Sequence, residues 1–317
     1  MKKRTRKLPA RAPATQDEPL SLVGVPDVQV PEPEEEVVKK PRPPFQLTLL
    51  LAQPCVPTAA MITQALQQSL PPQLFEQIME EGDGSVSLRC FGRRYQIHAV
   101  DQPMAQDRFT EALSHATEDK ELSSLVAQHQ AHWGVRQVGE LSNDSLGASI
   151  TAAVQLMHLS AFVAGGLKDH VQAMGVYWDS SEMLVSWADY QDQVDDTFAA
   201  MEKQAQDDEE AAKLLPDTLW IGLHVEDRPE GGWCLSKGLE LFTGYEWEMT
   251  VPHWDYQQVA AFMMLAVRYV YRTGHVLRKG EMVGLSDDMV KYFSMQACPL
   301  TDTEQALRFA LVPTPAG

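Results

Sequence analysis

A foldable body begins abruptly at Phe45, because the segment before it is rich in proline and contains no aromatic residue. That segment begins with basic residues, contains an acidic stretch from Glu32 to Glu36 and ends in residues rich in Lys, Arg and Pro. Such a composition cannot bury enough apolar surface to offset the entropy lost on ordering. We therefore expect residues 1–43 to form a disordered tail ahead of the folded body.

The first part of the body alternates strand and helix signals. Thr58 is a helix cap, Pro71-Pro72 ends that helix, and Phe91-Gly92-Arg93 has the spacing of a hairpin turn. The expected elements are strands at 45–52, 85–90, 94–100 and 131–138 and helices at 58–70, 105–115 and 120–130. This β-α-β-β-α-β order is the split βαβ pattern of ferredoxin-like domains, so we expect a ferredoxin-like α+β half over residues 44–140.

Residues 141–317 predict a second mixed α/β half, and the sheets of both halves should be mostly antiparallel. Glycines at 165 and 166 mark the end of a long helix, and Gly274 marks the end of another. The expected helices are 144–164, 189–205 and 256–272, and the expected strands are 171–178, 183–187, 218–225, a pair within 238–251 and a β-rich end.

The charge of the chain is strongly negative and uneven. The net charge is −18, and residues 1–43 carry nine Lys or Arg against seven Asp or Glu, which leaves −20 on the body. A body this acidic repels phosphate backbones, so we expect no nucleic-acid partner. The same field steers basic proteins toward it, which favours a basic protein partner.

The cysteines and apolar runs indicate a cytoplasmic protein outside the membrane. Cys55, Cys90, Cys234 and Cys298 are far apart and form no C-x-x-C motif. The basic N-terminus is not followed by the apolar stretch of a signal peptide. The longest apolar runs, 47–52 and 260–267, are shorter than the ~18–20 residues that span a bilayer.

Three segments in the C-terminal third together resemble a bacterial family. They are Trp220-Ile-Gly-Leu-His-Val-Glu226, Leu235-Ser-Lys-Gly-Leu-Glu-Leu-Phe242 and 270–286, which includes Arg278-Lys-Gly-Glu-Met-Val-Gly284. The chain resembles the family called domain of unknown function 4261, with its strand histidine, S-K-G-L turn and D-G-D-T-V-G loop. The chain departs from that loop at Lys279 and Met282. The resemblance implies a bacterial, cytoplasmic protein and no particular reaction.

His224 and Glu226 are the candidate catalytic residues. Residues two apart on a strand share a face, so the carboxylate could orient the imidazole as a general base. His129 and His132 have a spacing that can bind a metal ion, but they fall at a helix-to-strand junction, where the two imidazole rings need not point toward the same ion. We therefore expect no metal site and no cofactor.

Two kinds of surface residue are the candidate binding residues. Asp189, Asp192, Asp195 and Asp196 recur along the helix expected at 189–205, whose other side carries Tyr190, Val194, Phe198 and Met201. This is the pattern of a solvated acidic face, and such a face could attract a basic partner. Trp178 and Trp233 adjoin predicted turns and are the aromatic candidates for a binding surface.

Two functions remain consistent with the sequence. The first is a non-enzymatic bacterial interaction or accessory protein, immunity-like or secretion-associated, that covers a basic protein surface. The second is an enzyme that uses His224 with Glu226 in a cleft between the two halves. Neither the substrate, the partner nor the oligomeric state follows from the sequence.

Overall fold

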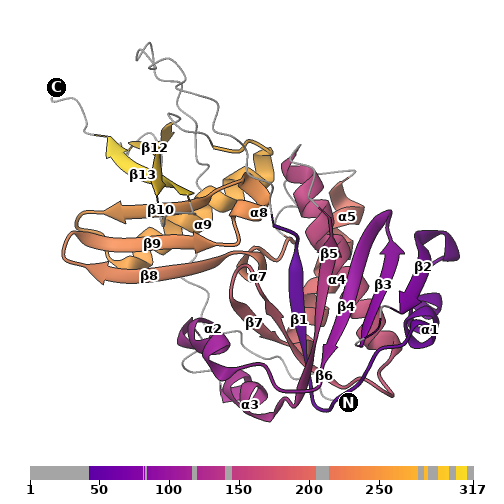
Figure 1. Cartoon of the computed structure of the whole chain (residues 1–317). Coiled ribbons are helices and arrows are strands. Elements are labelled where there is room, and N and C mark those ends of the chain that lie inside the picture. Colours follow the sequence, from indigo (N-terminus) through magenta and orange to yellow (C-terminus); the bar gives the residue numbers. More distant parts are fainter. Residues whose placement is uncertain are drawn as a thin grey trace, which may run out of the picture.

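The chain folds around two mostly antiparallel β-sheets that stand side by side (Figure 1). The computed structural model describes residues 43–80, 82, 84–115, 120–139, 145–204, 214–277, 282–284, 292–299 and 305–312. The expected tail, apart from residue 43, lies outside these described residues. The expected α+β class with mostly antiparallel sheets is confirmed.

The first sheet, here called sheet A, has the strand order β2-β3-β4-β5-β1-β6-β7, and every pairing in it is antiparallel. The strands are β1 (Gln46–Leu51), β2 (Phe75–Glu80), β3 (Ser85–Cys90), β4 (Arg93–Val100), β5 (Ala131–Val138), β6 (Ala173–Trp178) and β7 (Met183–Ser186). β6 and β7 join this sheet, so it contains strands from both sides of residue 140, the expected boundary.

The ferredoxin-like arrangement is not confirmed. A split βαβ unit needs two parallel strands with one strand between them, here the strands that begin at Gln46 and Ser85. Two strands, β5 and β4, separate β1 from β3, and three successive antiparallel pairings leave them antiparallel. The sequence pattern did not predict β2, and this extra edge strand reverses the chain before β3 begins.

The second sheet, sheet B, has the order β11-β12-β13-β10-β9-β8 and one parallel pairing, between β10 and β13. Its strands are β8 (Gly222–Arg228), β9 (Gly231–Lys237), β10 (Glu246–Val251), β11 (Met282–Gly284), β12 (Tyr292–Pro299) and β13 (Gln305–Val312). Two expectations need correction here. Part of the strand expected at 218–225 is the helical turn α7 (Asp217–Trp220), and the strand pair expected within 238–251 is α8 (Glu240–Thr243) followed by β10.

Helices cover both sheets. Helices α1, α4 and α5 pack on one face of sheet A, α2 and α3 cover the other face beside β7, and α9 packs on sheet B. Their bounds are α1 (Ala59–Ser69), α2 (Thr110–His115), α3 (Lys120–Gln128), α4 (Leu146–Gly166), α5 (Trp187–Gln204) and α9 (Tyr256–Thr273), with short 3-10 helices η1 (Pro72–Leu74) and η2 (Gln106–Phe109).

The helix ends follow local chemistry. The Thr58 hydroxyl accepts from the Met61 N–H, as its place before α1 predicted, and Asp255 with Gln258 forms a capping box at the start of α9. Gly274, at φ 69°, ends α9 in the left-handed conformation. Helix α4 ends at Gly166, as the glycine pair predicted, and Gly166 has a second role, because a Cβ there would lie 2.7 Å from the Ala65 Cα. It lets α4 cross α1 closely.

Helix α4 is the central helix of the core. By length and composition alone it could cross a membrane, although its apolar residues do not form one unbroken run of that length in the sequence. Most of its apolar window is buried inside the protein, as in a core helix, so this resemblance to a membrane span is weak.

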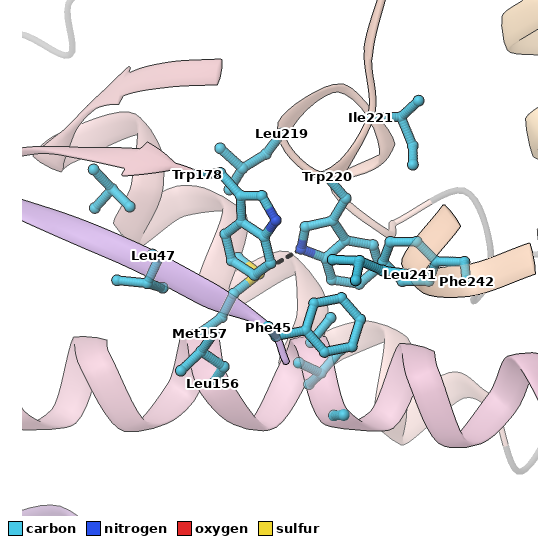
Figure 2. Packing of buried hydrophobic residues seen from close by; sticks show 14 of the residues in the cluster. Phe45, Leu47, Leu156, Met157, Trp178, Leu219, Trp220, Ile221, Leu241 and Phe242 are labelled. Carbon is cyan, nitrogen blue, oxygen red and sulfur yellow. Dashed lines mark hydrogen bonds between the residues drawn. The ribbon is translucent and has the colours of Figure 1, made fainter. Parts of the chain in front are cut away.

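A buried aromatic group joins the two sheets (Figure 2). Phe45 precedes β1, and its ring lies 6.3 Å from Trp178 at the end of β6 and 5.3 Å from Phe242 of α8. Trp220 of α7 stacks on Phe242 at 5.4 Å and donates from Nε1 to the Met157 sulfur of α4. The residues of both sheets therefore belong to one continuous core.

The turn between β6 and β7 presses directly on sheet B. The Ser181 hydroxyl donates to the Leu219 carbonyl, and a Cβ at Gly222 would lie 2.1 Å from the Ser181 carbonyl oxygen. Gly238 has φ 89°, and a Cβ there would lie 2.5 Å from the Trp220 carbonyl oxygen. These glycines are needed because only a bare backbone fits at this contact.

Gly222→Ala tests this contact. The added methyl group must displace the Ser181 backbone, so the free energy of unfolding should fall by ~1–3 kcal/mol. Gly165→Ala is the control, because a Cβ at this exposed helical position meets nothing within 4 Å, and it should stabilise the protein by up to ~1 kcal/mol. Urea unfolding measures both values, and equal effects of the two substitutions would contradict the proposed packing.

Candidate functional site

The most chemically suggestive cluster lies in the seam where β8 of sheet B meets the β6–β7 turn and α2. His224 on β8 is flanked by two carboxylates from different elements. Its Nδ1 lies 3.6 Å from Oε1 of Glu111 on α2, and its Nε2 lies 3.4 Å from Oε2 of Glu182 in the β6–β7 turn. The side chain of His224 is 24% exposed, so solvent reaches this seam site.

A second ion pair borders the same seam. Arg108 of η2 lies 3.3 Å from Oδ1 of Asp179, and the Thr48 hydroxyl donates to Oδ2 of Asp179 at 3.0 Å. Burial raises the pKa of Asp179, although Thr48 and Arg108 oppose this rise. Burial also raises the pKa of Tyr177 to about 12, and the charge of Glu182 adds to the effect. The seam site thus combines an imidazole, a phenol, a guanidinium and three carboxylates.

The expected pairing of His224 with Glu226 is not what the structure shows. Glu226 accepts from Nε of Arg228 at 2.8 Å, and Arg228 stacks over the Trp233 ring at 3.8 Å. Glu226 shares a face with His224, as the strand alternation predicted. It lies farther toward the hairpin tip, where the next residue on that face, Arg228, is its partner.

The seam site can hold and transfer a proton, but its geometry does not suit a metal ion. Glu111 and Glu182 approach opposite ring nitrogens, so they cannot close around one ion bound to His224. No group of three or more His, Cys, Asp or Glu among the described residues is placed to hold a metal.

His129 and His132 are both held by the backbone. His129 Nδ1 contacts the Val126 carbonyl and its Nε2 accepts from the Met104 N–H, whereas His132 Nδ1 contacts the Gln102 carbonyl. These contacts give both rings a structural role, and burial lowers the pKa of His132.

Helix α5 carries the predicted acidic face. Asp192, Asp195 and Asp196 are exposed, whereas Asp189 accepts from the Ser186 hydroxyl at the start of the helix. The buried side contains Tyr190 and Val194 as expected, together with Thr197 and Ala200. Two residues expected on the buried side are instead exposed, Phe198 at 37% and Met201 at 51%, because Thr197 and Ala200 occupy the buried stripe.

The two aromatic candidates have different environments. Trp178 is completely buried in the aromatic group between the sheets, so the expectation that it forms a binding surface is wrong. Trp233 is half-buried, donates from Nε1 to Glu248 and is covered by Arg228. Among the residues that the structure describes, the cysteines Cys55, Cys90 and Cys234 are free thiols, and burial raises the pKa of each.

Sequence patterns missed several seam residues, namely Arg108, Glu111, Asp179 and Glu182. Asp179 and Glu182 fall in a segment that was predicted only as a turn. The positive φ of Glu182, 56°, is uncommon outside glycine and distinguishes this residue once the backbone is known. No local pattern could have linked this turn to β8, which follows about forty residues later.

Glu246, at the start of β10, is a buried carboxyl that explains the S-K-G-L turn. It accepts from the Ser236 hydroxyl and from the N–H groups of Gly238 and Leu239. Burial raises its pKa from 4.5 to about 8, although the bonds from Ser236 and Gly238 oppose the rise. Ser236, Gly238 and Leu239 all belong to the strand and turn beside Glu246, so Glu246 fixes the turn that holds Gly238 against Trp220.

Comparisons with known proteins identify no relative: no family model, curated protein or solved structure matches this chain. The resemblance to domain of unknown function 4261 therefore stays a prediction. Its strand histidine and S-K-G-L turn lie in β8 and β9, whereas residues 278–281 of its last loop lie outside the described residues.

Glu246→Gln should remove a pH dependence from stability. A carboxyl whose pKa rises from 4.5 to about 8 on folding keeps its proton only in the native state within that window. Stability therefore falls as pH rises through it, by at most ~1.4 kcal/mol per pH unit. Urea unfolding across this window should show a shallower slope for Glu246→Gln than for the exposed control Glu230→Gln, and equal slopes would refute the assignment.

Proposed function

We propose that this chain is a non-enzymatic interaction protein that binds a basic protein partner through the exposed face of α5. The observation that carries the proposal is the combination of Asp192, Asp195 and Asp196 with the exposed apolar residues Phe198 and Met201 on one helix. Carboxylates steer and orient a basic partner, and exposed apolar side chains supply area that becomes buried on binding.

The environment of α5 supports a rigid binding face. The Tyr190 hydroxyl bonds to Ser160 of α4, and the Thr197 hydroxyl bonds to His158 of the same helix. The Phe198 ring stacks on His158 at 3.7 Å with the planes 7° apart, so one side of this ring is held while the other faces outward. A face held in place loses little entropy on binding.

The partner follows from this chemistry. We infer a surface that presents Lys or Arg side chains beside at least one apolar side chain, spaced to reach Asp195 and Phe198, which are neighbours one turn apart on α5. The net charge of −18 adds long-range attraction for such a partner. An accessory or immunity-like protein that masks a basic surface would need these properties, and so we propose that role in a bacterial cytoplasm.

A second function rests on the seam site. We propose as the alternative an enzyme in which His224, between Glu111 and Glu182, transfers a proton and Arg108 contacts an anionic part of the substrate. The observation that favours it is the partly exposed imidazole, whose Nε2 is buried, with one carboxylate beside each ring nitrogen. The neighbouring Tyr177 hydroxyl stays protonated at neutral pH, given its raised pKa, so it can donate a hydrogen bond to a substrate but is a weak acid.

Neutralising the α5 face should weaken partner binding. The triple variant Asp192→Asn, Asp195→Asn, Asp196→Asn should lower the affinity for a partner recovered by affinity purification on the order of tenfold, since exposed ion pairs contribute ~0.2–1 kcal/mol each. The loss should shrink as salt is added, because salt screens the pairs in the native complex. Surface plasmon resonance over a range of ionic strength measures both effects.

The matched control is Asp101→Asn, Asp107→Asn, Glu230→Gln, which changes the net charge equally at exposed positions outside α5. This control should keep most of the affinity. Equal losses in the two triple variants, binding that is insensitive to ionic strength, or recovery of no stoichiometric partner would each contradict the proposal.

The enzymatic alternative predicts that one imidazole controls turnover. Any reaction found by screening substrates with the native protein should slow by on the order of a hundredfold in His224→Gln, because positioned acid–base groups contribute about that much. His170→Gln, an exposed histidine elsewhere, is the control and should keep the native rate. Equal rates in all three proteins would exclude His224 as the catalytic group.

A further inference from the structure

Part of sheet A has a face that no described helix covers. Helices α1, α4 and α5 bury one face, and α2 and α3 cover the other face only beside β6 and β7. The outward positions of β3, β4, β5 and β1 alternate with core positions such as Leu88, Ile97 and Val135. This area, here called the open face, carries Ser85, Ser87, Arg89, Arg94, Gln96, His98, His132, Gly134, Arg136 and Gln46, of which Ser85 and Ser87 are buried by neighbouring groups.

The open face has the opposite charge sign to the rest of the protein. None of the outward positions on β3, β4, β5 and β1 is acidic, although the chain carries −18 overall. Arg89 and Arg94 are direct cross-strand partners, which is unfavourable for two like charges. Carboxylates stand at the edges of this face: Glu76 lies opposite Arg89 on β2, and Asp179 pairs with Arg108 and accepts a hydrogen bond from Gln46.

A hollow of about 330 Å³ lies in the open face. Its lining residues come from four strands, and all but the glycine have polar side chains: Gln46, Ser85, Gln96, His98, Gly134 and Arg136. Gly134 creates the depth, because a Cβ at this position would meet nothing within 4 Å. A volume of this size is at the lower end of the ~300–1,000 Å³ typical of small-molecule sites.

The donors around the hollow are held in place. Arg136 donates from both Nε and Nη2 to Oε1 of Gln96, at 2.9 and 2.6 Å, which orients the plane of its guanidinium. Ser85 Oγ and His98 Nδ1 are 2.7 Å apart. Arg136 keeps N–H groups beyond those two bonds, and a guanidinium in a fixed orientation suits a carboxylate or phosphate.

A second hollow of about 170 Å³ lies next to the first, across the cross-strand pair Ser87 and Gln96. Arg89 and Arg94 line it, together with Met79. An anion near these arginines would relieve the repulsion between them, so the positive charge extends along the open face from Arg136 toward β2.

We propose that the hollow over Gly134 binds a small hydroxylated organic anion of the sugar phosphate class. Arg136, with the nearby Arg94, would hold the anionic group, and the polar side chains of Ser85 and His98 suit hydroxyl groups. No Phe, Tyr or Trp among the described residues lines either hollow, so there is no large aromatic surface on which a nucleobase could stack. The site is independent of the proposed α5 interface, because α5 packs against the opposite face of sheet A.

Isothermal titration calorimetry with glucose 6-phosphate tests the proposal, with glucose and inorganic phosphate as the two half-ligands. Saturable binding is expected for glucose 6-phosphate, weaker binding for phosphate and none for glucose. Arg136→Gln should weaken the binding on the order of tenfold or more, because it removes a charge-assisted pair. Arg228→Gln, an arginine on sheet B outside the hollow, should leave the affinity unchanged.

Gly134→Val fills the hollow and keeps the fold. A β-branched side chain suits a strand, and the space above Gly134 is open. Its thermal unfolding should match that of the native protein while its binding of glucose 6-phosphate is lost. Native affinity in Gly134→Val or in Arg136→Gln, or no saturable binding of glucose 6-phosphate to the native protein, would overturn the proposal.

A phosphoinositide head group carries the same chemistry as a free sugar phosphate. Cosedimentation with phosphatidylcholine vesicles, with and without phosphatidylinositol 4-phosphate, distinguishes the two sources. We expect no cosedimentation, which supports a free ligand. Cosedimentation that Gly134→Val abolishes would support the site with a lipid source, and cosedimentation that survives in both hollow variants would count against it.

Discussion

The structure depends on the aromatic packing between its two sheets. Phe45, Trp178, Trp220 and Phe242 come from the start of β1, the end of β6, α7 and α8, and all four are completely buried. Rings of this kind each remove ~150–250 Å² from water and prefer tilted or edge contacts, as here. Because the four rings contact one another, the orientation of sheet B relative to sheet A is fixed by the same burial that stabilises the fold.

That orientation determines where charged groups meet. The β6–β7 turn can lie against β8 only because Gly222 and Gly238 leave room for backbone, and this contact places Glu182 beside His224. Sheet A also separates two surfaces of opposite sign. The carboxylates of α5 lie outside the helical layer on one face, while Arg89, Arg94 and Arg136 lie on the other, so a basic partner and a small anion would not compete.

Sequence patterns predicted the elements whose signals are local. The helix cap at Thr58, the hairpin around Gly92 and the end of α9 at Gly274 follow from chemistry within a few residues. The order in which the strands pair could not be predicted from local signals. Strand β2 has no strong alternation of apolar and polar residues, and its presence reverses the direction in which β3 and the following strands cross the sheet. His224 was found as a candidate, but its partners Glu111 and Glu182 come from segments far away in the chain.

The sequence by itself determined the class of the fold, the acidity of the surface and the positions of most helices, since these depend on composition and on short-range periodicity. Tertiary structure alone decided that Trp178 is core, that Phe198 and Met201 are exposed and that a cationic hollow exists on an anionic protein. The physical reason is that the burial of a side chain and the charges around it depend on which helices and strands pack against each other. Such pairs form only when the aromatic contact between the sheets has brought distant segments together.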